Sequence, residues 1–212
     1  MTDYHRHFRT ADTIVGALAR RVGPFTLKPQ RNRFGMLVRS ILSQQLSTKA
    51  ARTIRGRLED LVAPSPITPE SLEGLTKEQL RGVGLSNNKA EFVLDLALKI
   101  RSGEVKLNTL GRKDDEAVIA ELTKIRGIGR WTAQMFLIFS LGRLNVFPHD
   151  DFGVRSAIRN LYSLPELPDK ATSHRIAAPW QPYATIASWY CWRSLELPKV
   201  SDAGAMPRVV AK

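Results

Sequence analysis

A short glycine-bearing segment between two helical patterns sets the strongest limit on what this chain can fold into. It reads Ile125-Arg-Gly-Ile-Gly-Arg-Trp-Thr-Ala133. Its glycines allow positive φ and close approach of another backbone, which predicts a tight hairpin that opens a helix. The start of such a helix presents unpaired N–H groups and a positive dipole end, both suited to a phosphate oxygen. We therefore expect Gly127, Gly129, Arg130 and Thr132 to bind phosphate.

An earlier tetrapeptide, Arg81-Gly-Val-Gly84, is similar to the hairpin sequence and also lies between two helical patterns. Because glycine is common just past a helix end, we interpret this first copy as an ordinary glycine-terminated turn. The second copy differs because Phe147-Pro-His-Asp-Asp151, which supplies two carboxylates, follows it in the chain.

Helical periodicity recurs along the chain, and the alternation typical of strands does not. One buried helix face is predicted from apolar residues at the i, i+3, i+4 spacing: Phe34, Leu37, Val38, Ile41 and Leu42. Capping signals predict further helices that begin near Ser47, Thr68-Pro69, Thr76 (with Gln79), Ser86 and Asp114. Others are expected over about 130–141, 151–162, 169–177 and 182–194. The expected fold class is all-α.

The chain carries many more basic than acidic side chains. Its 212 residues include 32 Lys and Arg against 20 Asp and Glu, a formal net charge of +12. Such an excess favours a polyanionic partner, because binding to phosphates releases counterions. A basic protein that is merely soluble is the alternative at this point.

The single cysteine, Cys191, excludes a disulfide framework, a zinc cluster and an iron–sulfur cluster built from cysteines of this chain. The N-terminus has no apolar run of the kind found in secretory signals, and no stretch is long and apolar enough to span a membrane. We expect His5 and His7 to lie on a mobile terminus rather than to bind a metal. Residues 199–212 are expected to form a flexible tail.

Five separated motifs carry a resemblance to a known family. They are Ile41-Leu-Ser-Gln-Gln-Leu-Ser47, Gly84-Leu-Ser-x-x-Lys-Ala90, the hairpin with Trp131, Val146-Phe-Pro-His-Asp-Asp151, and the stretch from Trp180 to Trp189. From about Phe34 to Trp192 the chain resembles the helix-hairpin-helix superfamily of DNA glycosylases, and within it the DNA-3-methyladenine glycosylase II type. The match is specific because the motifs fall in the family's order.

The resemblance implies two helical subdomains with a helix-hairpin-helix motif and an active-site cleft between them. The hairpin subdomain would span 29–150, and residues 1–28 with 151–198 would form the second. Longer members of this type carry an extra N-terminal β-domain, for which the roughly 30 residues before the first core helix leave no room.

The carboxylate pair offers a candidate for the chemistry. N-glycosidic cleavage passes through an oxocarbenium-like sugar, which a nearby carboxylate can stabilise while it orients or activates water. Asp150 and Asp151 stand where a helix is expected to start, so composition alone favours an N-cap role for either. The resemblance places the family's catalytic aspartate on Asp151. Asp150 is then expected to be the cap or a supporting partner.

A flipped-out base needs apolar or aromatic walls, and stacking on a cationic base adds about 0.5–2 kcal/mol of cation–π attraction. By resemblance, Trp131 and Trp189 are the pocket tryptophans, and Met135, one turn after Trp131, shares that face. Helical spacing also allows the C-terminal tryptophans to be core residues. We assign Trp192 to the core, and Trp180 stays open between the two roles.

Extruding a base leaves a gap in the stack that a side chain must fill. The loop 43–47 stands where the family's wedge loop lies, and the resemblance puts Gln45 at the wedge position, with Leu46 as the alternative. A plain interhelical turn is the other interpretation. Lys49 and Arg52 are further candidates for phosphate contacts.

Trp131 stands where bifunctional relatives carry a nucleophilic lysine, and Lys124, before the hairpin, does not match that position. The resemblance therefore implies a monofunctional enzyme of base excision repair that hydrolyses the N-glycosidic bond of alkylated purines, of the 3-methyladenine class, in double-stranded DNA. No cofactor and no side-chain metal ligands are expected, although the hairpin backbone leaves room for a monovalent cation. We expect a monomer without membrane contact, in the cytoplasm and nucleoid of a bacterium or in the nucleus of a eukaryote.

Two other functions remain open. One is a non-catalytic helix-hairpin-helix module that binds DNA non-specifically, and the other is a glycosylase for oxidised or mismatched bases. A mere binder needs neither an acid nor an aromatic pocket. The missing cysteine cluster and the missing lysine argue against the commonest glycosylases of the second kind.

Overall fold

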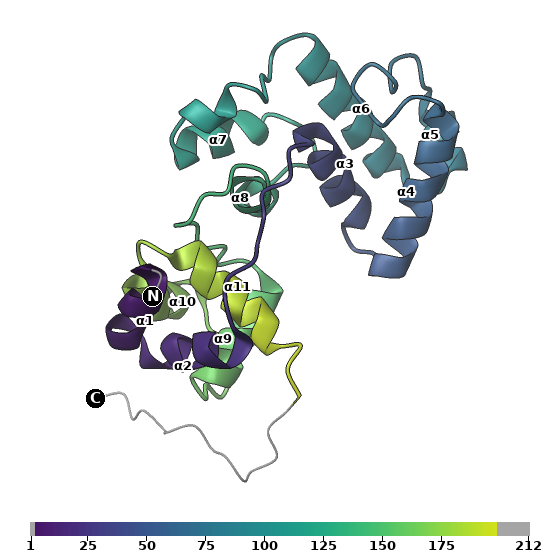
Figure 1. Cartoon of the computed structure of the whole chain (residues 1–212). Helices are drawn as coiled ribbons and strands as arrows, with labels where there is room; N and C mark the ends of the chain where they lie inside the picture. Colours follow the sequence, from purple (N-terminus) through teal and green to yellow (C-terminus); the bar gives the residue numbers. More distant parts are fainter. Residues whose placement is uncertain (1–2, 199–212) are drawn as a thin grey trace. The chain divides into compact units, whose positions relative to one another are not determined.

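The computed structural model describes residues 3–198, and in this range the chain is all-helical, without a β-strand (Figure 1). The expected all-α class is confirmed. The helices divide between two compact units. Unit 1 combines the N-terminal stretch up to Leu27 with the chain from Arg143 onward, and unit 2 comprises Lys28–Gly142. The tail expected to be flexible, 199–212, lies outside the described residues.

The boundary between the units differs from the division predicted from the sequence, which put residues 143–150 with the hairpin subdomain. The structure groups them with unit 1, because Thr185 holds them. Its Oγ1 donates a hydrogen bond of 2.7 Å to the Arg143 carbonyl and accepts one of 2.9 Å from the Val146 N–H. Its own N–H donates to the Leu144 carbonyl at 3.0 Å.

Unit 2 is built around one buried helix. Its helices are α3 (Arg33–Ser43), α4 (Thr48–Val62), α5 (Lys77–Gly82), α6 (Asn87–Arg101), α7 (Asp115–Leu122) and α8 (Arg130–Phe139), with a 3₁₀ turn at Leu110–Arg112. α3 packs against α4, α6 and α8. The five apolar residues of its predicted face are all buried, which confirms the helical pattern read there.

Most of the predicted helix starts in unit 2 are confirmed. Side chains of Ser47, Ser86 and Asp114 cap α4, α6 and α7, and Thr76 with Gln79 forms a capping box at α5. The first glycine tetrapeptide also behaves as predicted, because α5 ends at Gly82 and Gly84 follows at φ +105°.

The helix predicted after Thr68-Pro69 is wrong, since residues 68–74 form turns. Ser71 N–H donates to Thr68 Oγ1 at 3.1 Å, and Thr68 N–H donates to Ser71 Oγ at 3.0 Å. These reciprocal bonds have the pattern of a capping box, so the start signal at Thr68 is present. The backbone then continues with i→i+3 bonds, from Glu73 N–H to Glu70 O and from Leu75 N–H to Leu72 O, in place of a helical ladder. Gly74, at φ +79°, then turns the chain toward α5.

Unit 1 joins helices from both ends of the chain. They are α1 (Asp3–Ala11), α2 (Thr13–Val22), α9 (Phe152–Leu161), α10 (Lys170–Ala177) and α11 (Ala184–Ser194), with a 3₁₀ turn at Ala178–Trp180. α11 packs against both α2 and α9. The prediction of a mobile N-terminus is therefore wrong, because α1 and α2 carry core residues.

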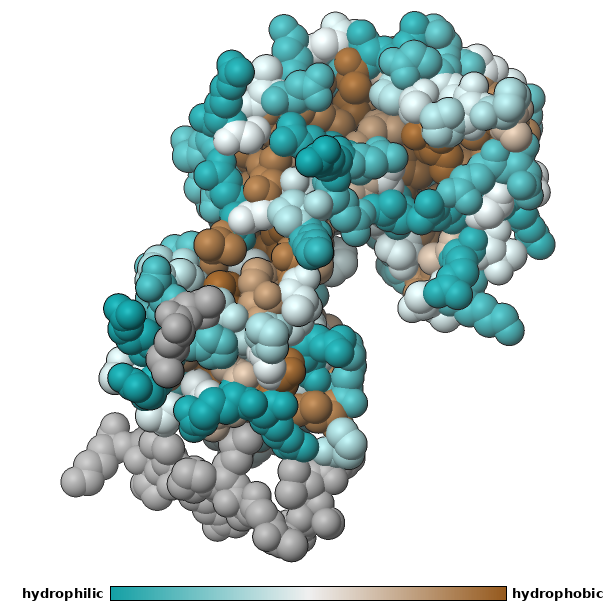
Figure 2. Space-filling model, in the orientation of Figure 1, coloured by the Kyte–Doolittle hydropathy of each residue, from teal (hydrophilic) through white to brown (hydrophobic). Residues whose placement is uncertain are grey.

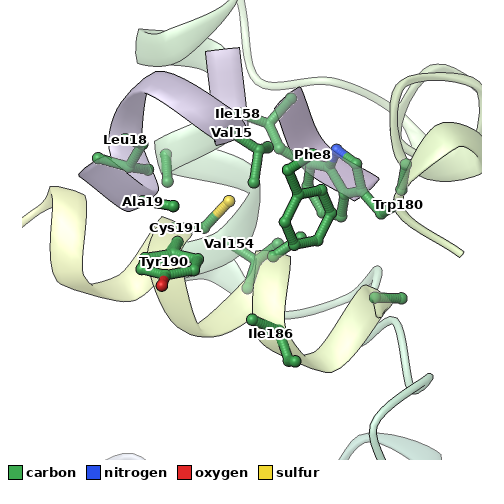
Figure 3. Close-up of a cluster of buried hydrophobic side chains, with 14 residues drawn as sticks. Phe8, Val15, Leu18, Ala19, Val154, Ile158, Trp180, Ile186, Tyr190 and Cys191 are labelled. Carbon is green, nitrogen blue, oxygen red and sulfur yellow. The ribbon is translucent and has the colours of Figure 1, made fainter. Parts of the chain in front are cut away.

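The core of unit 1 explains why the N-terminus is ordered (Figure 3). Phe8, Val15 and Leu18 are buried among residues of α9 and α11. Asp12 caps α2 by accepting from the Ile14 and Val15 N–H groups, and His7 Nε2 lies 2.8 Å from the Pro179 carbonyl oxygen. These contacts fix α1 and α2 to the unit.

Trp180, left open between core and pocket, is a core residue. Its side chain is fully buried, and its Nε1 donates a hydrogen bond of 2.9 Å to Asp12 Oδ2. Cys191 is also fully buried, as its place among apolar side chains in Figure 3 indicates, and burial raises the pKa of its thiol.

The surface of the chain is mixed in polarity. Figure 2 shows a face that is mostly hydrophilic, with hydrophobic residues set between the polar ones. Within residues 3–198, no helix combines the length and the apolar character that a membrane crossing requires.

Candidate functional site

The hairpin between α7 and α8 requires glycine at its first glycine position. Gly127 has φ +80°, and a Cβ built there would lie 2.1 Å from Cδ2 of Phe92. Ile125 and Ile128 on either side are buried, so the hairpin is anchored in unit 2 as predicted. Only a residue without a side chain satisfies both the backbone conformation and the close approach.

Gly129, unlike Gly127, does not adopt a positive φ. Its φ is −91°, which other residues adopt readily. A Cβ built there meets nothing within 4 Å, so the space beside it is open. Gly129 is the N-cap of α8, and among residues 3–198 no side chain caps that helix start. This arrangement leaves room for an anion beside the helix N-terminus.

The other two predicted phosphate-binding residues differ in accessibility. Arg130 is exposed, and its guanidinium forms two hydrogen bonds with the Glu116 carboxylate, one of them 2.9 Å long. The bond from Arg130 lowers the pKa of Glu116 below its usual range. Thr132 is buried. Arg130 is therefore at the surface beside the hairpin, whereas the Thr132 side chain faces the protein interior.

The predicted wedge loop lies at the surface of unit 2, between α3 and α4. Gln45 is exposed and has φ +55°, a conformation that costs free energy for a residue with a Cβ. Leu46 is 40% exposed, although it is a large apolar residue. Lys49 and Arg52, on the first turns of α4, are also exposed.

A hydrogen bond that the sequence did not reveal joins this loop to the hairpin. Gln44 Nε2 donates to the Gly127 carbonyl at 2.9 Å. The two segments are 83 residues apart in sequence, and no local pattern predicts their contact. Lys89 also contacts the loop, because its Nζ donates to the Gln44 carbonyl. In the sequence, only its place in the motif Gly84-Leu-Ser-x-x-Lys-Ala90 had drawn attention to it.

The predicted pocket residues on α8 differ in exposure. Trp131 is 38% exposed at the first turn of α8, near the hairpin, whereas Met135 is buried one turn later. Trp131 therefore exposes part of its ring to a ligand, whereas Met135 exposes almost no side-chain surface.

Asp151, expected from the resemblance to be the catalytic acid, is also the N-cap, a role that the sequence had predicted for Asp150. It is the N-cap of α9, where its Oδ1 accepts from Val154 N–H at 2.8 Å, and the same oxygen accepts from Trp192 Nε1 at 2.9 Å. The residue is only 9% exposed. Two donors from different helices therefore fix the orientation of this carboxylate.

The prediction of Asp150 as the cap is wrong. Its side chain is 62% exposed, and its Oδ2 lies 3.2 Å from Nε2 of the buried His149. The helix starts one residue later than that prediction required, because Asp151 N–H donates to Pro148 O in the preceding turn.

Two tryptophans of α11 lie at the edge of unit 1. Trp189 is half-buried and packs edge-on against Phe25, with ring centroids 5.3 Å apart. The Arg193 guanidinium carbon lies 6.0 Å from the Trp189 ring centroid. Trp192, assigned to the core from the sequence, packs against the core of unit 1, but it is half-buried and its Nε1 also donates to Asp151. It is thus a site residue that helical spacing alone did not distinguish from a core residue.

Each unit thus contributes a distinct chemical capability. Unit 2 presents an open helix N-terminus and an exposed loop, and unit 1 presents an oriented carboxylate and a partly exposed aromatic ring. Among residues 3–198, no group of three or more His, Cys, Asp or Glu side chains could hold a metal ion.

Comparison with known proteins agrees with these features. The chain matches the HhH-GPD superfamily of base excision DNA repair proteins over residues 38–182. A protein of Bacillus subtilis is 36% identical over 170 residues, which are 77% of this chain and 59% of that protein. The chain therefore spans less than two thirds of that relative's length.

A curated relative and a crystal structure from Schizosaccharomyces pombe extend the comparison. DNA-3-methyladenine glycosylase 1 is 36% identical over 163 residues, 76% of this chain and 72% of that protein. The crystallised 3-methyladenine DNA glycosylase of this yeast, in complex with abasic DNA, has a TM-score of 0.83 at 32% identity and covers 95% of this chain and 100% of its own. From its matched motifs and its helical fold, this chain belongs to the HhH-GPD superfamily of base excision DNA repair proteins.

Proposed function

We propose that this chain is a monofunctional DNA glycosylase of base excision repair, which hydrolyses the N-glycosidic bond of alkylated purines of the 3-methyladenine class. The observation that carries the proposal is the buried Asp151 carboxylate, held by Val154 and Trp192. Relatives named as DNA-3-methyladenine glycosylases support the substrate class.

Unit 2 supplies the grip on DNA in this proposal. The backbone at Gly127 and Gly129, with the Arg130 side chain and the Thr132 backbone N–H, binds a phosphate of the strand, because an uncapped helix start attracts anions. Gln45 or Leu46 fills the gap that the extruded base leaves. Both side chains stand at the surface on a loop tied to the hairpin, as a wedge requires.

Unit 1 supplies the acid. Asp151 stabilises the positive charge that develops on the sugar and orients the attacking water. A purine alkylated on a ring nitrogen carries a positive charge and departs readily, so one carboxylate suffices. No cofactor takes part, and any monovalent cation at the hairpin would be held by backbone carbonyls.

The contacts with the flipped base are assigned to each unit separately, to Trp131 and Met135 in unit 2 and to Trp189 in unit 1. Trp131 and Trp189 offer partly exposed rings on which a cationic base can stack. Met135 is buried and therefore exposes little surface to a base.

Monofunctional chemistry follows from Trp131, the second residue of α8. Trp131 has no amine that could form a Schiff base with the sugar, so water is the nucleophile and the product is an abasic site. Borohydride trapping of a covalent enzyme–DNA adduct would contradict this assignment.

The decisive experiment incubates the protein with methylated DNA and identifies the released bases. We expect release of 3-methyladenine by the wild type. Asp151→Asn should abolish release while DNA binding persists, because asparagine keeps the N-cap acceptor and loses the charge. Asp169→Asn is the matched control, since Asp169 caps α10 through the Thr172 N–H and should release bases at the wild-type rate.

The non-catalytic alternative predicts a different result. A DNA-binding module would bind methylated DNA and release no base at any enzyme concentration. Near-normal turnover by Asp151→Asn would instead leave the glycosylase assignment in place and show that Asp151 is not the catalytic acid. We propose a monomer that acts on double-stranded DNA wherever the cell keeps it, the cytoplasm of a bacterium or the nucleus of a eukaryote.

A further inference from the structure

One side of α6 contacts two segments of unit 2 that are far apart in sequence, the loop 43–47 and the hairpin 125–129. Its contact residues are Lys89, Phe92, Asp95 and Lys99. Their spacing of three, three and four residues places them along one stripe of a helix. At about 1.5 Å per residue, the stripe is roughly 15 Å long.

Lys89 holds the loop end of this stripe. Its Nζ donates to the Leu42 carbonyl at 2.8 Å and to the Gln44 carbonyl at 2.6 Å. The last carbonyls of a helix lack partners within the helix and attract a cation, and Leu42 lies in the last turn of α3. Burial lowers the pKa of the Lys89 ammonium, which agrees with a group withdrawn from water for this contact.

The rest of the stripe holds the hairpin. The Phe92 ring occupies the space that a side chain at Gly127 would need. Asp95 Oδ2 accepts from the Arg126 N–H at 2.8 Å, and Lys99 Nζ donates to the Lys124 carbonyl at 2.8 Å. Lys124, Arg126 and Gly127 are thereby all fixed to α6.

Gln44 closes a ring of contacts. Its carbonyl accepts from Lys89, and its side-chain Nε2 donates to the Gly127 carbonyl at 2.9 Å. Gly127 in turn lies against Phe92 of α6. The loop and the hairpin therefore cannot move apart without breaking a hydrogen bond or leaving the α6 stripe.

We propose that Lys89 is a positioning residue that, through Gln44 and the α6 stripe, sets the spacing between the wedge loop and the phosphate-binding hairpin. The proposal rests on the proposed function, in which one segment grips a phosphate while the other enters the base stack. Lys89 acts through backbone carbonyls and touches no DNA. Misplacing a functional group by about 1 Å can cost roughly 100-fold in rate, so a spacing error should appear in turnover.

The test replaces the amine and then restores it. Lys89→Cys removes both bonds, and alkylation with 2-bromoethylamine converts the cysteine into a lysine analogue. Cys191 is fully buried, so the engineered thiol is the reactive one in the folded protein. We expect kcat on methylated DNA to fall about 10- to 100-fold with affinity for undamaged DNA unchanged. Aminoethylation should restore at least half of the wild-type kcat.

A second readout is independent of chemistry. The fluorescence of 2-aminopurine beside an abasic site reports unstacking by a wedge, and Lys89→Cys should reduce the change that the wild type produces. Gln44→Met should reduce it as well, because it cuts the bond to Gly127 and keeps Lys89. Lys106→Cys, at an exposed lysine of the same unit, is the control for the lost charge and for the reagent.

The outcomes separate this proposal from the proposed function. An unchanged kcat and fluorescence response for Lys89→Cys, or a loss that aminoethylation leaves in place while the melting temperature matches the wild type, would overturn the positioning role. A wild type that releases no base overturns the glycosylase assignment, whereas the fluorescence measurement still decides whether Lys89 positions the loop.

Discussion

Trp192 donates a hydrogen bond of 2.9 Å from Nε1 to Oδ1 of Asp151. The same oxygen caps α9 by accepting from Val154 N–H. Gly153 lies between these groups, and a Cβ built there would be 3.1 Å from both Asp151 Oδ1 and Trp192 Cδ1. Two donors thus fix Asp151 Oδ1, and on the Gly153 side there is no space for an added side chain.

Trp192→Phe should slow base release while the protein stays folded. The variant loses one donor to a charged oxygen, an interaction of about 1.5–3 kcal/mol, so single-turnover release should fall by roughly 10- to 100-fold. Trp180→Phe is the control, because its Nε1 donates to Asp12 instead. That variant should melt at a lower temperature and release bases at the normal rate when folded; a rate loss in Trp180→Phe equal to that in Trp192→Phe would remove the special role of Trp192.

The two hairpin glycines should respond differently to alanine. Gly127→Ala meets Phe92 and needs a positive φ, which costs roughly 1–2 kcal/mol before the clash is counted, so the melting temperature should drop. Gly129→Ala meets nothing within 4 Å and should keep the wild-type melting temperature. Its methyl group would stand where a phosphate approaches, so DNA affinity should fall. Wild-type affinity in Gly129→Ala would place the phosphate elsewhere.

The ion pair between Arg130 and Glu116 should compete with DNA for the guanidinium. Both side chains are well exposed, so Glu116→Gln should change stability little. It should tighten DNA binding, because the variant removes the Glu116 carboxylate that competes with a DNA phosphate for Arg130. Arg130→Gln should weaken binding and reduce the slope of log affinity against log salt by about 1. Fluorescence anisotropy across a salt series measures both, and identical slopes for wild type and Arg130→Gln would exclude a phosphate contact.

Unit 1 should lose stability in alkaline solution through Tyr162. Burial, and next the charge of Asp12, which accepts its hydroxyl hydrogen bond, raise the pKa of Tyr162 above its ordinary value near 10. The neutral phenol therefore stabilises the fold fully below about pH 10, and this contribution is lost as the pH rises further and the unfolded chain alone gives up the proton. Urea unfolding of wild type and Tyr162→Phe should show a steeper alkaline decline for the wild type. Parallel curves would contradict the shift.

The sequence predicted those parts of the fold that local rules govern. Ser47, Ser86 and Asp114 cap helices because their side chains accept from backbone N–H groups three residues later. Thr68 did not start a helix, although Ser71 exchanges capping-box bonds with it, because the chain turns away at Gly74, which has φ +79°. The order of the N-terminus depends on Phe8 reaching helices more than 140 residues later, and such a contact leaves no periodic trace.

The candidate site shows the same division. Gly127 could be assigned from the hairpin pattern, because its conformation is a local requirement. The roles of Gln44 and Lys89 could not, since each depends on a partner at least 45 residues away. Trp192 carried the same helical spacing as a core residue, and only the position of Asp151 distinguishes the two.

The chain order of unit 1 has a consequence during protein synthesis. Helices α1 and α2 leave the ribosome first, but their packing partner α11 extends to Ser194. From Val22 to Cys191 the ribosome must add 169 residues (191 − 22), which takes roughly 8–34 s at about 5–20 residues per second. Unit 2 is complete well before then. Nascent chains should therefore pass through a state in which Phe8 and Leu18 await their partners, a window in which a chaperone that binds apolar helices would act.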